Sequence, residues 1–154
     1  MPNRGMNKKG PSNDEYETPK WLLAALDMEF GFDFDAAANR TNAVCDRFST
    51  NIDGSKKDLQ AHPEWRVFCN PPYSDIDPFV NVMQHTQNTW VFLLPVRTGA
   101  PWFRVLRRME KQGKAEIRFL RKRVQFLLNG KVPLNPKTGK PSGPRFDSMV
   151  VVVR

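Results

Sequence analysis

The segment from Val67 to Pro78 constrains the fold of this chain more than any other part of its sequence. It begins with a short apolar run, Val67-Phe68-Cys69, which is typical of a buried strand. It ends with Asp77-Pro78, a common helix start, and Asn70-Pro71-Pro72-Tyr73 lies between. This strand–loop–helix order favours an α/β domain, in which ligands bind beyond the carboxyl ends of parallel strands. The loop therefore marks a candidate site.

The four loop residues combine groups that suit the binding of a flat, amine-bearing ring. The Asn70 side-chain oxygen can accept a hydrogen bond from an exocyclic amine, and the Pro71 carbonyl can accept a second. Pro71 and Pro72 restrict the backbone, so that this carbonyl keeps its direction. Tyr73 offers a face on which a base taken out of a duplex can stack. Asn-Pro-Pro is also an ordinary turn sequence, so the loop alone leaves a purely structural interpretation open.

Further apolar segments predict one mostly parallel sheet. The continuous run Trp90–Leu94 is expected of a central parallel strand. Phe32–Ala36 and Arg47–Thr50 are short strand candidates. Near the end of the chain, Ser148–Val153 is predicted to pair antiparallel with Val124–Leu128, so that the sheet closes with a C-terminal antiparallel hairpin. One further strand is expected at residues 115–120. A length of 154 residues suits a single domain.

Capping residues predict where helices begin and end. Thr18-Pro19 opens a helix with Thr18 as its N-cap, and Gly31 ends it. Two more helices are expected over residues 77–87 and 101–113. Between the strand candidates, Asn51–Gly54 is predicted as a turn, and Asp58 is placed in a loop.

The net charge is divided between the two parts of the chain. Residues 1–96 hold nine basic and 13 acidic residues, a net charge of −4, whereas residues 97–154 hold 15 and three, a net charge of +12. This asymmetry favours a polyanion as partner, although a solvated basic helix would also produce part of it. Residues 129–145, hereafter the basic segment, contain four prolines, three glycines and four basic residues, with no acid. The predicted nucleic-acid contacts are Arg121, Lys122, Arg123, Lys131, Lys137, Lys140 and Arg145.

Other classes of protein receive little support. With two cysteines, no signal peptide and no long apolar run, we expect a cytoplasmic protein with reduced thiols and no membrane association. His62 and His85 are isolated, so no metal site is predicted. Residues 1–13 are interpreted as a disordered basic tail, and residues 14–154 as the domain.

Several segments, taken in order, resemble the bacteriophage family of Dam-like DNA N6-adenine methyltransferases. They are Tyr16-Glu17-Thr18-Pro19, Phe34-Asp35-Ala36-Ala37-Ala38, Asn70-Pro71-Pro72-Tyr73, Leu93-Leu94-Pro95, Trp102-Phe103, Ile117-Arg118-Phe119, Arg123-Val124-Gln125-Phe126 and the strand 148–153. The resemblance implies a Rossmann-like methyltransferase domain, S-adenosylmethionine as methyl donor and adenine in double-stranded DNA as acceptor. In a phage it also implies a location in the host cytoplasm and protection of DNA from restriction.

The resemblance also implies where the methyl donor binds. Thr18 and Pro19 would lie beside it, and Asp35 and Ala36 would follow the first strand at the crevice. There the Asp35 carboxylate can meet an ammonium group, or it can cap a following helix. Asp58 is a candidate acceptor of a hydrogen bond from the adenine amine of the donor. Asp46 is a rival candidate, for a contact with the ribose hydroxyls. The stretch after Asp35 lacks the glycines that many methyltransferases carry there, but its alanines still admit a ligand close to the backbone.

The expected reaction is direct, in-line displacement on a flipped adenine, with Asn70 and the Pro71 carbonyl on the amine and Tyr73 stacked on the ring. Asn-Pro-Pro-Tyr also occurs in enzymes that methylate the side-chain amide of a protein glutamine, and RNA adenine and cytosine N4 are further possible acceptors. A non-catalytic, basic nucleic-acid-binding domain is the alternative of a different class.

Overall fold

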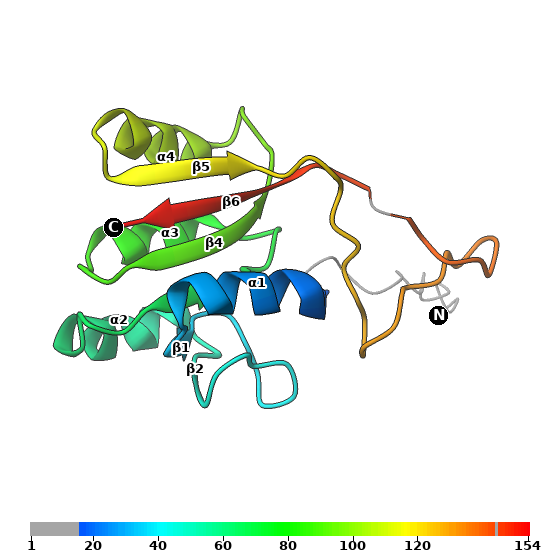
Figure 1. The fold of residues 1–154 in the computed structure, drawn as a ribbon, viewed down its shortest axis with the longest axis horizontal. Helices are drawn as coiled ribbons and strands as arrows, with labels where there is room; N and C mark the ends of the chain where they lie inside the picture. The colour runs from blue at the N-terminus through cyan, green and yellow to red at the C-terminus, as the bar shows by residue number, and fades with distance from the viewer. Residues whose placement is uncertain (1–15, 144) are drawn as a thin grey trace, which may run out of the picture.

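The computed structural model describes residues 16–143 and 145–154 of the chain. The predicted basic tail, residues 1–13, lies outside the described residues. A six-stranded sheet forms the centre of the domain, in the order β2-β1-β3-β4-β6-β5 (Figure 1). Its strands are β1 (Phe34–Asp35), β2 (Arg47–Phe48), β3 (Val67–Cys69), β4 (Trp90–Pro95), β5 (Ala115–Phe119) and β6 (Ser148–Val153).

The first four strands of the sheet are parallel, and β6 alone runs in the opposite direction, so that the edge strand β5 is again parallel to the first four. β1 pairs with both β2 and β3, and β3 pairs with β4, all in parallel. β6 lies between β4 and β5 and is antiparallel to both. All residues of β4 and β6 are buried, as their continuous apolar sequences predict. The fold is therefore a mixed α/β domain whose centre is formed by β4 and β6.

Four helices cover the two faces of this sheet. They are α1 (Lys20–Phe30), α2 (Ile52–Ala61), α3 (Asp77–Gln84) and α4 (Pro101–Lys111). Figure 1 shows α1 across the front of the sheet, with α3 and α4 behind it. α2 packs against α3, and α3 packs against α4. None of these helices is long and apolar enough to cross a membrane, as far as the described residues go.

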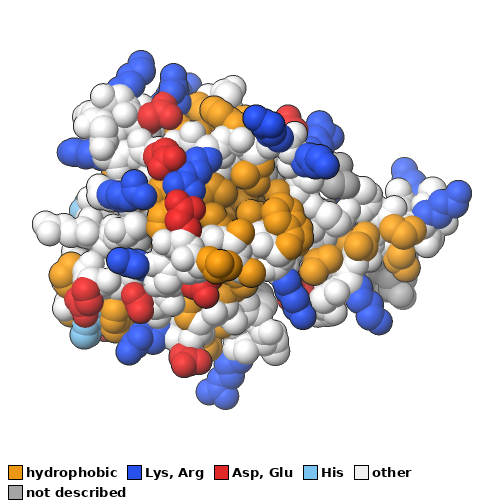
Figure 2. Space-filling view, viewed as in Figure 1, with side chains coloured by type: hydrophobic (Ala, Val, Ile, Leu, Met, Phe, Trp, Pro, Cys, Tyr) orange, Lys and Arg blue, Asp and Glu red, His pale blue; other side chains and the backbone are white. Residues whose placement is uncertain are grey.

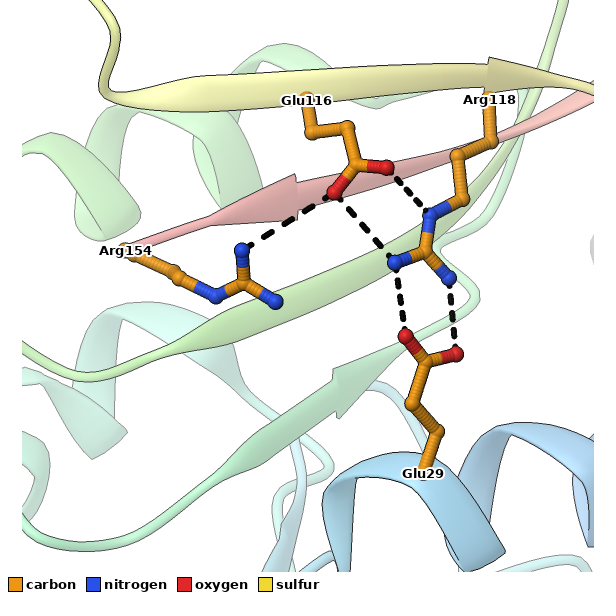
Figure 3. A network of polar contacts seen from close by, with 4 residues as sticks. All are labelled: Glu29, Glu116, Arg118 and Arg154. Carbon is orange, nitrogen blue, oxygen red and sulfur yellow. Dashed lines mark hydrogen bonds and ion pairs between the residues drawn. The ribbon is translucent and has the colours of Figure 1, made fainter.

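An ion-pair network fastens α1 to the far strand of the sheet (Figure 3). The Arg118 guanidinium on β5 donates two hydrogen bonds of 2.7 Å to the Glu29 carboxylate on α1. It donates another of 2.8 Å to Glu116, which also pairs with Arg154 at 3.9 Å. The hydrogen bonds from Arg118 lower the pKa of both carboxyl groups. The network fixes α1 on the sheet in addition to its buried residues Leu22, Leu26 and Phe30.

The predicted pairing of β6 with Val124–Leu128 is wrong. β6 pairs with β4 and β5 instead, and within the described residues the 124–128 run forms only isolated bridges, Leu127 with Glu17 and Leu128 with Lys131. Val124 and Phe126 are buried, so the apolar pattern correctly marked burial. Periodicity alone does not separate a buried strand from a buried irregular segment.

Two local predictions between β2 and β3 are also wrong. Asn51–Gly54 is not a turn but the start of α2, in which the Asn51 side chain accepts a hydrogen bond of 3.2 Å from the Asp53 N–H. Asn is as favourable at an N-cap as in a turn, which explains the error. Asp58 consequently lies on a helix and not in a loop.

Thr18 does not cap α1, although the helix begins and ends where the sequence predicts. The N-cap is Pro19, whose carbonyl accepts hydrogen bonds from Leu22 and Leu23, and no side chain caps the helix. Gly31 ends it as expected: its φ of 65° is left-handed, and its N–H donates to the Asp27 carbonyl at 2.8 Å. The Thr18 hydroxyl is therefore available to another partner.

Candidate active site

The strand order reverses between β1 and β3, which places their carboxyl ends side by side. From β1 the chain continues to β2 on one side, whereas β3 pairs on the other side. Ala36 follows β1 and donates its N–H to the Phe68 carbonyl at 2.9 Å, and Asn70 follows β3. Such a reversal is where open α/β sheets bind their ligands. The structure thus brings the Asp35 and Asn70 segments to one crevice, as the sequence predicts.

Two adjoining hollows occupy this crevice. The first, of about 750 Å³, is lined by Thr18, Asp35 and Asn70 among others, and the second, of about 630 Å³, by Ala36, Pro72 and Asn70 among others. They share the lining residues Ala37, Asn42 and Asn70. Asn70 stands between the two hollows, so one side chain can contact ligands in both.

Thr18 binds the side chain of Asn70 directly. The Asn70 Nδ2 group donates a hydrogen bond of 3.1 Å to the Thr18 hydroxyl oxygen, across 52 positions of sequence. An amide presents two donors on its nitrogen and two acceptor positions on its oxygen. Because the bond to Thr18 uses the nitrogen, the Asn70 oxygen can still accept a hydrogen bond from an incoming amine. Sequence reasoning selected both residues but missed their contact.

Asp35 is buried at the end of β1, with 2% of its surface exposed. Its two carboxylate oxygens accept hydrogen bonds of 3.1 Å from the Ala37 and Val44 N–H groups, which hold the turn after β1. No helix follows β1 directly, so the predicted alternative of a helix cap is wrong. Burial raises the pKa of the Asp35 carboxyl to about 6, although both hydrogen bonds oppose this change. A carboxyl shifted in this way inside a crevice is a common feature of functional sites.

We expect Asp35 to make the protein less stable as the pH rises from about 4 to about 6. Its pKa is about 6 in the folded chain against an ordinary value of 3.8, so the folded state binds the proton more tightly over this interval. The loss in the free energy of unfolding should be roughly 3 kcal/mol. Urea unfolding at several pH values, with Asp35→Asn for comparison, measures it. Equal pH slopes for the two proteins would show that the buried carboxyl does not titrate there.

The candidate catalytic loop forms hydrogen bonds with β4 and with a residue just after β4. The Arg97 guanidinium donates a hydrogen bond of 2.8 Å to the Tyr73 carbonyl. The Tyr73 hydroxyl donates to the Leu93 carbonyl at 3.2 Å. Arg97 was not selected from the sequence, although its position two residues after a buried strand marks it as part of the same edge. These bonds hold Tyr73, the last residue of the Asn-Pro-Pro-Tyr loop, at both its carbonyl and its hydroxyl.

Tyr73 is packed more tightly than the sequence prediction of an open stacking face implies. Its side chain is 5% exposed and lies edge to face with Phe126 and Phe146, at centroid distances of 5.9 and 5.6 Å. Burial raises the pKa of its hydroxyl, which therefore stays protonated. In this conformation the ring supports the loop, and it is closed to solvent.

The remaining predicted residues lie outside the crevice. Asp58 is exposed on α2 and lines neither hollow, and Asp46 is also exposed. The basic residues predicted to bind nucleic acid are exposed, and Arg123 forms an ion pair of 3.2 Å with Asp147. The basic segment projects away from the sheet (Figure 1), and basic and hydrophobic side chains occur together at its end (Figure 2). Within the described residues, no three His, Cys, Asp or Glu side chains are grouped to hold a metal ion.

Fold and site together define an α/β domain with a polar, two-part crevice at the carboxyl ends of its parallel strands. The family model for DNA N-6-adenine-methyltransferase (Dam) matches residues 5–154, and the chain belongs to this family. A DNA N-6-adenine-methyltransferase of Escherichia phage T1 is 33% identical over 118 residues, covering 74% of this chain and 48% of the phage protein. The chain thus spans about half the length of that relative. The resemblance described from the sequence is confirmed.

Proposed function

We propose that this protein transfers a methyl group from S-adenosylmethionine to the N6 amine of adenine in DNA. The observation that carries the proposal is the Asn70 amide, oriented by Thr18 at the junction of the two hollows in a member of the Dam family. The parallel half of the sheet, with its reversal between β1 and β3, supports a Rossmann-like methyltransferase domain.

The lining of the crevice fits the chemistry of the methyl donor. A molecule with a nucleoside at one end and an amino acid at the other requires an elongated site with polar groups, and the two adjoining hollows supply one. Asp35 and Thr18 line the first hollow, where a carboxylate and a hydroxyl suit the amino-acid end. Ala36 lines the second hollow, next to the backbone. Pro19 is buried at the start of α1 and sets the direction in which Thr18 enters the site.

Asn70 and Pro71 are proposed to activate the adenine amine. The Asn70 oxygen and the Pro71 carbonyl each accept one N–H, which localises the nitrogen lone pair. When bound, the cofactor supplies an electrophilic methyl group on sulfur, which the amine attacks in line without a covalent enzyme intermediate. The amine then releases its proton to water. The hydrogen bond from Arg97 to the Tyr73 carbonyl keeps this loop in place during the reaction.

Base flipping is proposed to bring the adenine to this loop, and it places a condition on Tyr73. Phe126 and Phe146 pack against the Tyr73 ring. In the sequence, Phe126 precedes the basic segment and Phe146 follows it. If DNA displaces this segment, it also moves the two phenylalanines and opens the Tyr73 face to the base. The exposed cations at residues 121–123 and in the basic segment are proposed to contact the phosphates.

Thr18→Val is expected to lower kcat for methyl transfer by about tenfold, with a smaller effect on KM for DNA. Valine keeps the shape of threonine but offers no acceptor to the Asn70 Nδ2 group, so the amide loses its fixed direction. Thr18→Ser keeps the hydroxyl and should restore most of the rate. Steady-state kinetics of the three proteins measure these effects. A Thr18→Val enzyme with the wild-type kcat would contradict the proposed orientation of Asn70.

The acceptor is tested by incubating the protein with radiolabelled S-adenosylmethionine and duplex DNA, RNA or protein. We expect label in duplex DNA. Label confined to RNA or protein would replace the proposed substrate, and no label anywhere, with no thermal shift at saturating cofactor, would reject the activity.

A further inference from the structure

The outer face of α4 carries a row of cations that the proposed catalytic site does not use. Arg104, Arg107, Arg108 and Lys111 are all exposed, and they are spaced at i, i+3, i+4 and i+7, which places them on one face of the helix. They line a hollow of about 680 Å³ together with Thr98 and Phe103. This surface is called the α4 hollow; the helix itself lies behind the sheet next to β5 (Figure 1).

The stability of α4 does not account for this row. Each of these cations lies three or four positions from another member of the row. Like charges at these spacings destabilise a helix. Arg107 forms an ion pair with Glu110, but no acidic partner is found for Arg104, Arg108 or Lys111 among the described residues. Cations in the last turn complement the helix dipole, which explains Arg108 and Lys111 but not Arg104 in the first half. An anionic ligand would offset the repulsion that remains.

The dimensions of the row indicate what kind of anion fits. Seven positions of helix separate Arg104 from Lys111, a length of about 10 Å. A row of cations over this length matches a row of negative charges better than a single phosphate group, and duplex DNA carries one charge per about 1.7 Å of its axis. A continuous phosphate backbone is therefore the ligand that the α4 hollow matches best.

The α4 hollow is also joined to the catalytic loop. Thr98, which lines it, follows Arg97, and Arg97 binds the Tyr73 carbonyl at 2.8 Å. The residues just before α4 are therefore connected directly to the loop that carries Asn70. The chain leaves the sheet after β5, and the basic segment that follows projects away from it, so the basic segment and α4 are separate (Figure 1).

We propose that the α4 hollow, through Arg104, Arg108 and Lys111, is a second DNA-binding surface that holds the phosphate backbone beside the target base. This inference rests on the proposed function, because the DNA is the methylation substrate. The contacts are made to phosphates, so they add affinity and fix the position of the duplex without reading its sequence.

The salt dependence of binding tests this surface without requiring catalysis. Fluorescence anisotropy with a labelled duplex that extends beyond the catalytic loop on both sides gives the binding constant at several salt concentrations. For Arg104→Gln/Arg108→Gln we expect a slope of log K against log salt that is shallower than wild type by about 2, since each phosphate contact contributes about 0.9. Lys56→Gln/Lys57→Gln on α2 removes the same charge and should leave the slope unchanged.

A third variant separates charge from folding. Arg104→Lys/Arg108→Lys keeps both charges and should retain most of the wild-type slope. The proposal is overturned if the glutamine variant has the wild-type slope, or if the lysine variant loses as much as the glutamine variant. A wild-type protein that binds DNA with the predicted slopes but methylates nothing would reject the proposed activity and leave this DNA surface in place. Methylation with no slope change would reject this surface alone.

Discussion

Asn70→Ala is expected to abolish most methyl transfer to duplex DNA while leaving cofactor binding nearly intact. The alanine removes the oxygen that accepts from the adenine amine, and losing one preorganised hydrogen bond to a reacting group costs about 10²–10³-fold in kcat. It also leaves Thr18 without its partner, but Thr18 can bind water in the first hollow. Calorimetry with S-adenosylmethionine and kinetics with saturating DNA separate the two effects.

A matched control for this variant exists on α3. Asn81 is exposed there and lines neither hollow, so Asn81→Ala should keep full activity. If Asn70→Ala retains the wild-type kcat, Asn70 does not activate the amine. If it loses cofactor affinity to the same degree as kcat, its role is to bind the methyl donor.

Tyr73→Ala is expected to unfold far more easily than the wild-type protein. The ring is buried between Phe126 and Phe146, and removing an aromatic ring from such a position costs about 3–5 kcal/mol. For a chain of this size the melting temperature should fall by roughly 6–20 °C. Tyr73→Phe keeps the ring and loses only the hydrogen bond to the Leu93 carbonyl, at a cost of about 1 kcal/mol.

These two variants also separate support of the loop from stacking on a base. Tyr73→Phe retains an aromatic face, so it should give the wild-type fluorescence change with a duplex carrying 2-aminopurine at the target position. Thermal melting and this fluorescence change are the measurements. Tyr73→Ala with wild-type stability would show that the ring is not part of the core, and Tyr73→Phe without the fluorescence change would assign the effect to the hydroxyl.

The crevice could be located from the sequence because its elements are local. Val67–Cys69 is apolar and short, Asn70-Pro71-Pro72 cannot continue a strand, and Asp77-Pro78 opens a helix, so the order of elements is evident without tertiary information. The charge division similarly requires only counting. Both the edge on which Asn70 lies and the exposed basic segment were therefore accessible to prediction.

Apart from the local ambiguity of Asn51 between a turn and a helix cap, the sequence was least informative where distant parts of the chain decide the outcome. The Thr18 hydroxyl binds Asn70, and no local pattern reports a partner 52 positions away. Val124 and Phe126 are buried, and Phe126 packs against Tyr73, but an apolar run alone does not distinguish such packing of an irregular segment from a strand. The row of cations on α4 was visible in the sequence, but its connection to the catalytic loop through Arg97 required the fold.

The most direct test of the central claim is the identity of the methylated base. Duplex DNA is incubated with S-adenosylmethionine and either the wild-type protein or Asn70→Ala, and its nucleosides are quantified by mass spectrometry. The proposed function predicts N6-methyladenine with the wild-type protein and a loss of at least about 10²-fold in its rate of formation with Asn70→Ala. Methylated cytosine in its place, or no methylated nucleoside from a protein that binds the cofactor, would contradict it.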